Sequence, residues 1–89
     1  MGNRKTGLPL ERHAALGLEL ARMRDRLTEL STEILRAYPK GSLPHRRASS
    51  VTISVDALRE QLDARAYAEH GPAAAEAYYP RRELRDAPD

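Results

Sequence analysis

The sequence predicts an all-α fold, an antiparallel two-helix hairpin with a heptad seam that dimerises into a four-helix bundle. Apolar residues recur at heptad spacing in two long segments, and a stretch with two prolines and a glycine separates them. The 89 residues include no Phe, Trp or Cys. Because a chain of this length buries only about 60% of its unfolded surface, we expect a homodimer to complete its core.

Residues 9–38 are predicted to form the first helix. Its apolar residues alternate between spacings of four and three, which places them on one face of a helix. Pro9 suits a first helical turn, and Pro39 ends the helix because the residue before a proline avoids helical geometry. The predicted seam residues here are Leu16, Leu20, Met23, Leu27, Leu30 and Ile34.

Residues 45–70 are predicted to form the second helix, which Gly71 and Pro72 end. Its seam residues are Val51, Val55, Leu58 and Leu62. In an alternative, the chain is irregular over residues 49–54, and Ser54 caps a shorter helix over 55–70. Antiparallel folding about residue 42 places the two halves of the seam opposite each other.

The turn, residues 39–44, borders a group of basic side chains at Lys40, His45, Arg46 and Arg47. Lys40 follows a helix C-terminus, where a cation is favoured. Arg46 and Arg47 fall in a first helical turn, where a cation is disfavoured and an anion is stabilised. The turn is therefore a candidate site for an anion or an acidic partner, and a solvated basic turn is the alternative.

Residues 1–8 are expected to form a flexible arm, and residues 71–89 a tail that is partly disordered or forms one short helical turn. In the tail, Tyr78, Tyr79, Arg81 and Arg82 form a compact recognition element if they are exposed. Alternatively, the two tyrosines fold back over the open end of the hairpin. Leu18, Leu35 and Tyr67 lie off the seam and are candidates for an association surface.

Charge is unevenly distributed along the chain. Residues 1–50 hold ten Lys and Arg against five Asp and Glu, and residues 51–89 hold five against eight. The two halves are therefore complementary, which suits folding of one onto the other. The net charge of +2 leaves little field to attract a polyanion.

The sequence predicts a protein that is not an enzyme. Cysteine chemistry is excluded, and no nucleophile elbow, phosphate-binding loop or dinucleotide fingerprint is present. His13 and His70 are brought together by the hairpin, with Glu11 and Glu69 nearby, and such a set suits a divalent metal. Ordinary structural roles explain the two histidines better: His13 fills the end of the seam, and His70 is a basic residue at a helix C-terminus. We therefore expect no metal site and no cofactor.

No apolar run approaches the 18 or so residues that a membrane span needs, and the N-terminus lacks the apolar region of a signal peptide. A cytoplasmic location without membrane contact is the expectation. The predicted function is a protein–protein interaction, adaptor or regulatory module that binds a protein partner or itself. A nucleic-acid-associated regulator that uses the basic turn is the alternative.

A third hypothesis comes from Tyr79 and Glu83, which form a Y-x-x-x-E arrangement after the second helix. A helical hairpin with this motif resembles the small substrates of type VII secretion systems. The resemblance covers residues 79–83 alone. Those hairpins carry a Trp-x-Gly turn, whereas this chain has YPKGS. The resemblance implies a secreted helical hairpin.

Overall fold

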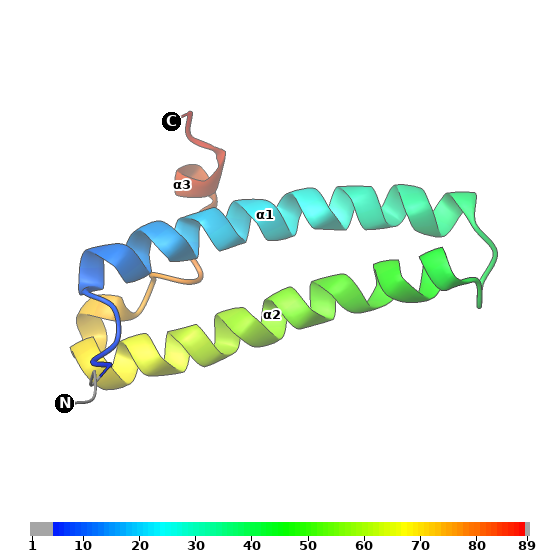
Figure 1. Cartoon of the computed structure of the whole chain (residues 1–89). Helices are drawn as coiled ribbons and strands as arrows, with labels where there is room; N and C mark the ends of the chain where they lie inside the picture. The colour runs from blue at the N-terminus through cyan, green and yellow to red at the C-terminus, as the bar shows by residue number, and fades with distance from the viewer. Residues whose placement is uncertain (1–4, 89) are drawn as a thin grey trace.

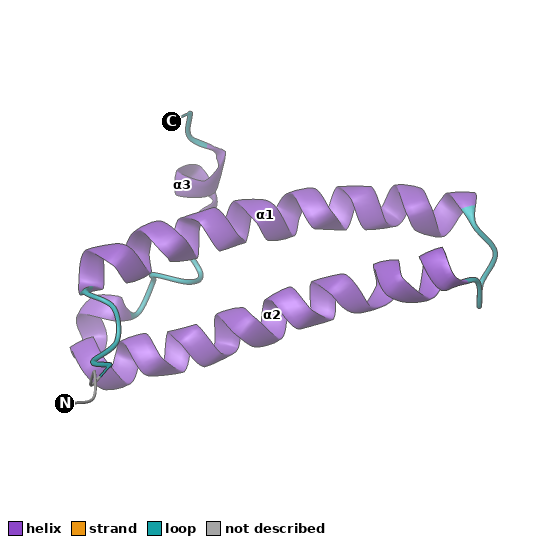
Figure 2. Cartoon of the chain, in the orientation of Figure 1, coloured by secondary structure: helices purple, strands orange, loops and turns teal. Residues whose placement is uncertain are grey.

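The computed structural model describes residues 5–88, which form two long helices joined by a tight turn and followed by a short tail (Figure 1). Helix α1 spans Leu10–Ala37 and α2 spans Leu43–His70. The 3₁₀ turn η1 spans Gly71–Ala74, and α3 spans Arg82–Asp86. Figure 2 shows helices and loops, and no strand, in the described chain. The predicted all-helical hairpin is confirmed.

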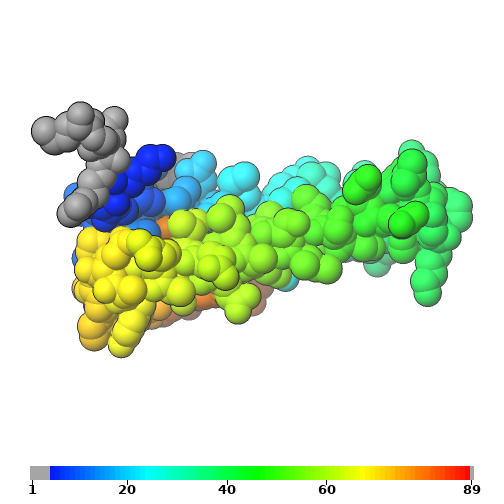
Figure 3. All heavy atoms as spheres, turned by 60° about the horizontal axis from the view of Figure 1, so that its bottom comes forward, coloured from blue at the N-terminus to red at the C-terminus, as the bar shows by residue number. Residues whose placement is uncertain are grey.

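The molecule is long and thin (Figure 3). Its principal extents are 49 × 38 × 20 Å, and its radius of gyration is 16.0 Å. A compact domain of this length would have a radius of gyration of about 12 Å. The hairpin therefore exposes much of the surface of both helices.

The turn is shorter than predicted, because α2 begins at Leu43 instead of residue 45. The Ser42 hydroxyl accepts a hydrogen bond of 3.4 Å from the His45 N–H, and Pro44 occupies the first turn, where its missing N–H costs nothing. Gly41 has a φ of 94°, which favours glycine in this turn. Since α2 is continuous over residues 49–54, the alternative of an irregular segment there is wrong.

The two long helices meet through small and polar side chains as much as through large apolar ones. Besides Leu20, the buried residues in the middle of α1 and in α2 are Ala21, Ser31, Ala48, Arg59 and Ala66. Small residues let the helices approach closely, but they bury little apolar area.

The predicted seam residues lie at different depths. Leu20 is buried, while Leu16, Leu27, Ile34, Val51, Val55 and Leu62 are partly buried. Met23, Leu30 and Leu58 are exposed, with fractions of 49%, 38% and 49%. Each of these three directly precedes a residue that is buried or joins the two helices, namely Arg24, Ser31 and Arg59. They therefore lie about 100° around the helix from the contact.

The main apolar cluster lies at the open end of the hairpin, where the tail returns. Tyr78 is fully buried there against Leu20, Ala66 and Ala74. The tail approaches α1 at Gly17, where a Cβ atom would overlap the Ala77 carbonyl. Of the two alternatives for the tyrosines, the structure shows Tyr78 folded back over the open end.

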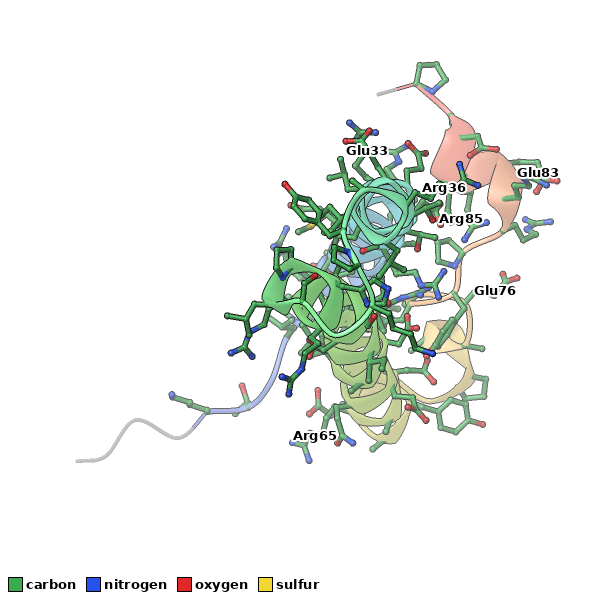
Figure 4. All side chains as sticks on the ribbon, turned by 90° about the vertical axis from the view of Figure 1, so that its right-hand side faces the viewer. Glu33, Arg36, Arg65, Glu76, Glu83 and Arg85 are labelled. Atoms are coloured by element: carbon green, nitrogen blue, oxygen red, sulfur yellow. The ribbon has the colours of Figure 1, made fainter. Side chains whose placement is uncertain are left out.

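The tail and the described part of the N-terminal arm lie on opposite sides of the hairpin. Figure 4, which looks along the helices from the turn, shows the tail on one side of the pair and the arm leaving on the other. On the tail side, Arg22 of α1 donates hydrogen bonds to the carbonyls of Leu84, Arg85 and Ala87, at the C-terminal end of α3. On the arm side, the Leu8 carbonyl bonds the His70 ring at 2.8 Å. The predicted arm also includes residues 1–4, which lie outside the described residues.

Neither long helix, nor any other helix within residues 5–88, is apolar enough over a sufficient length to cross a membrane.

Gly17→Ala tests the close approach of the tail to α1. Glycine to alanine inside a helix normally stabilises by about 1 kcal/mol. Here the added methyl group overlaps the Ala77 carbonyl and must displace the tail, so we expect a net loss of about 1–3 kcal/mol in the free energy of unfolding. Thermal unfolding followed by circular dichroism measures it. A raised melting temperature would show that the tail does not pack at Gly17.

Candidate functional site

The open end of the hairpin holds a buried polar cluster centred on Tyr78. Its hydroxyl and His13 Nδ1 are joined by a hydrogen bond of 2.6 Å, and the two rings meet edge to face at 5.6 Å. Burial raises the pKa of the Tyr78 hydroxyl. The fold therefore favours the neutral phenol and loses stability as the pH rises above about 10, where a tyrosine in the unfolded chain ionises.

Arg59 fixes the backbone beside Tyr78. Its guanidinium donates through Nη2 to the Tyr78 carbonyl at 2.8 Å and stands 4.6 Å from the centre of the Tyr79 ring. The side chain is only 8% exposed. Its charge is matched by Asp56, whose Oδ1 lies 3.5 Å from Arg59 Nη1. Arg59 thus joins α2 to the tail.

Asp56 also joins α2 to α1. Arg24 donates to both of its carboxylate oxygens, through Nε at 3.0 Å and Nη2 at 3.2 Å. This bidentate hydrogen bonding by Arg24 holds the pKa of the Asp56 carboxyl below its usual range. The pair is part-exposed, so its contribution to stability is screened by solvent. Its bidentate geometry fixes the register of α1 against α2.

His13, Glu69 and His70 come together beside Tyr78. One possible ligand atom from each residue lies within 4.8 Å of those of the other two. The His13 and His70 rings are 5.5 Å apart, and His13 Nε2 is 3.7 Å from Glu69 Oε1. The predicted proximity of His13 and His70 is confirmed. These three are the described residues that could hold a metal ion.

A second feature is an apolar hollow of about 520 Å³ between α1, η1 and α3. Leu10, Leu18 and Leu84 contribute apolar walls, and Glu11 and Glu76 contribute carboxylates. Leu18, a predicted association residue, therefore lies beside the tail.

The other two predicted association residues lie elsewhere. Leu35 is partly buried, and Tyr67 is exposed near the end of α2.

The basic residues predicted at the turn differ in their exposure to solvent. Lys40, Arg46 and Arg47 are exposed, while His45 is partly buried. Arg46 and Arg47 line a shallow hollow of about 280 Å³ with Leu43 and Ser50. The first turn of α2 carries no acidic side chain.

The predicted tail residues have different environments. Tyr78 is buried and is therefore not an exposed recognition residue, whereas Tyr79, Arg81 and Arg82 are exposed. Arg82 pairs with Asp86 within α3 at 3.6 Å. Tyr79 precedes α3, while Glu83 lies within it, so the two are not carried by one continuous helix.

The arm side of the hairpin carries apolar side chains at spacings of seven residues. We call them the apolar stripe: Leu16, Met23 and Leu30 on α1, and Val51 and Leu58 on α2. Met23, Leu30 and Leu58 are the most exposed of these.

Sequence reasoning missed Gly17, Arg24 and Arg59, which lie at the contact between the helices or between α1 and the tail, whereas the apolar spacing of the second helix does extend to the buried Ala66. A signal was present, because Gly17 and Arg24 repeat at a spacing of seven, as do Arg59 and Ala66. Glycine and arginine are not apolar, so a search for apolar spacing passes over them.

No family model matches this chain, and neither the curated proteins nor the solved structures include a significant match to it.

Tyr78→Phe removes one hydroxyl and leaves the buried His13 Nδ1 without its partner. We expect the free energy of unfolding to fall by about 1–3 kcal/mol. Tyr79→Phe is the matched control, because the exposed Tyr79 keeps its ring over Arg59, and its effect should stay within about 0.5 kcal/mol. Chemical denaturation measures both. Equal effects would contradict the role of the Tyr78 hydroxyl.

Proposed function

We propose that the protein is a non-enzymatic interaction module, and that its apolar stripe pairs with the stripe of a second copy in a four-helix bundle. The observation that carries this proposal is the exposure of Met23, Leu30 and Leu58 on the side that the tail leaves open. An adaptor or regulatory role follows if the bundle presents its remaining surfaces to another protein.

Helix geometry places the stripe residues of α1 and α2 on the same side. Met23 precedes Arg24 and Leu58 precedes Arg59, so both are rotated in the same sense from the contact. Because the two helices are antiparallel, equal rotations lead to one side of the pair. Asp25, the residue after Arg24, lies on the opposite side of α1, where it pairs with Arg85 of the tail at 3.7 Å.

The composition of the helix contact favours a second copy as the occupant. Its small and polar side chains bury little apolar area, and the largest fully buried side chains are Tyr78 and His13. In a four-helix bundle each helix uses adjacent heptad positions to meet two neighbours. The heptad seam then contributes to two contacts. Leu20 faces the other helix of the same hairpin, and the apolar stripe faces the second copy. A net charge of +2 raises little repulsion between copies.

Burial of the exposed apolar side chains of the stripe supplies part of the free energy of association. Complete burial of a Leu or Met contributes about 1.5–3 kcal/mol, so the exposed half of each contributes about 1 kcal/mol. Met23, Leu30 and Leu58 occur twice in a dimer, which gives a gross term of about 6 kcal/mol before the cost of association. Partial burial of Leu16 and Val51 adds to it.

Leu58→Asp should weaken dimerisation by at least about 100-fold, because each dimer would bury two unpaired carboxylates. Helical content should remain, since Leu58 lies outside the contact within the hairpin. Sedimentation equilibrium of the nuclease-treated chain measures the dissociation constant, and the monomer mass is 10.0 kDa.

Ile53→Asp is the matched control for this experiment. Ile53 is also on α2 and is 69% exposed, but it is rotated away from the stripe, so its substitution should leave the dimer intact. Tyr67→Asp tests the other predicted surface. Dissociation by Tyr67→Asp but not by Leu58→Asp would move the interface away from the stripe. A monomeric wild-type chain that binds nucleic acid through Arg46 and Arg47 would favour the nucleic-acid alternative.

A further inference from the structure

We propose that His13, Glu69 and His70 form a binding site for a transition-metal ion, with Zn²⁺ as the best-suited ion. The site lies at the open end of the hairpin, where α1, the end of α2, the arm and the tail meet. It does not depend on dimerisation.

The first support is an unsatisfied atom at the centre of the cluster. His13 is 2% exposed, and its Nε2 is buried without a hydrogen-bond partner. Glu69 Oε1, 3.7 Å away, is also buried without one. A buried nitrogen and a buried carboxylate oxygen that face each other without a hydrogen bond are costly, and coordination of one cation satisfies both.

The second support is that one ring nitrogen of each imidazole is already held by an oxygen. Metal-binding histidines usually hold the other ring nitrogen in a hydrogen bond to an oxygen. Here His13 Nδ1 is bonded to the Tyr78 hydroxyl at 2.6 Å, and His70 Nε2 to the Leu8 carbonyl at 2.8 Å. A carbonyl only accepts, so His70 Nε2 carries the proton and Nδ1 carries the lone pair. When His13 donates through Nδ1, its lone pair is on Nε2, facing Glu69.

The ligand types select the ion. Two imidazole nitrogens and one carboxylate oxygen suit Zn²⁺, whereas Mg²⁺ and Ca²⁺ prefer oxygen ligands alone. The separation of 3.7 Å between His13 Nε2 and Glu69 Oε1 is close to the spacing of two ligands on one tetrahedral ion. Three protein ligands leave a fourth position for water, and the adjoining hollow of about 250 Å³ gives access.

Two positively charged side chains, Arg65 and Lys5, border the site. Arg65 Nη2 pairs with Glu69 Oε2 at 3.0 Å, which fixes the carboxylate and leaves Oε1 for the metal. Lys5 and Arg65 both line the adjoining hollow. They lower the affinity for a cation without occupying the ligand atoms of the two histidines.

The test is zinc titration of the full chain without an affinity tag, by calorimetry and by thermal unfolding. We expect one Zn²⁺ per chain and a melting temperature that rises with zinc concentration, with no rise from Mg²⁺ or Ca²⁺. Co²⁺ should give a visible absorption band of tetrahedral intensity. Glu69→Gln and His70→Gln should each weaken zinc binding at least tenfold while the metal-free protein keeps its helical content.

His45→Gln is the matched control, because His45 lies in the first turn of α2, far along the hairpin from the cluster. It should bind zinc as the wild type does. His13→Asn would also remove a ligand, but His13 is buried, so the two other variants carry the test if it does not fold. The proposal is overturned if no zinc binds at one per chain, if Glu69→Gln and His70→Gln bind normally, or if His45→Gln loses as much affinity.

Discussion

The side chain of Tyr78 is buried where the tail meets both long helices. Its hydroxyl is bonded to His13 of α1, and its carbonyl accepts from Arg59 of α2, so one tail residue is tied to both helices. This position requires Gly17, since any larger residue would meet the Ala77 carbonyl. It also aims His13 Nε2 at Glu69, and thereby creates the cluster to which we assign zinc. The contact with Arg59, the need for glycine at residue 17 and the orientation of His13 thus all involve one tail residue and its neighbour.

The same arrangement leaves the remainder of the hairpin thinly packed. The main apolar cluster lies around Leu20, Ala66, Ala74 and Tyr78, whereas the contact nearer the turn includes the buried Ser31 and Ala48. The tail covers one side of the pair at the open end, and the arm begins to cover the other (Figure 4). Beyond them, Met23, Leu30 and Leu58 are left exposed. A fold that concentrates its contacts at one end therefore leaves an apolar surface for a second copy.

The long-range organisation was accessible from the sequence, because heptad spacing and the prolines at 9, 39 and 44 are local signals. The proximity of His13 and His70 followed from antiparallel pairing alone. The rotation of each helix was not accessible, because an apolar pattern does not reveal that Arg24 and Arg59 satisfy their charges on Asp56 between the helices. Glycine at 17 carries no apolar signal, and its role depends on a carbonyl sixty residues away. The choice between a free and a folded-back tail depended on a hydrogen bond between distant side chains.

If the contacts around Tyr78 hold the hairpin together and the half nearer the turn depends on a second copy, the two halves should differ in hydrogen exchange. Hydrogen exchange read by mass spectrometry over a dilution series measures this difference. At concentrations where the chain is monomeric, residues 13–22 and 58–70 should be the most protected, and residues 27–52 should exchange faster. Raising the concentration should slow exchange around Met23, Leu30 and Leu58. Equal protection of both halves in the monomer, or protection that does not change with concentration, would contradict the account.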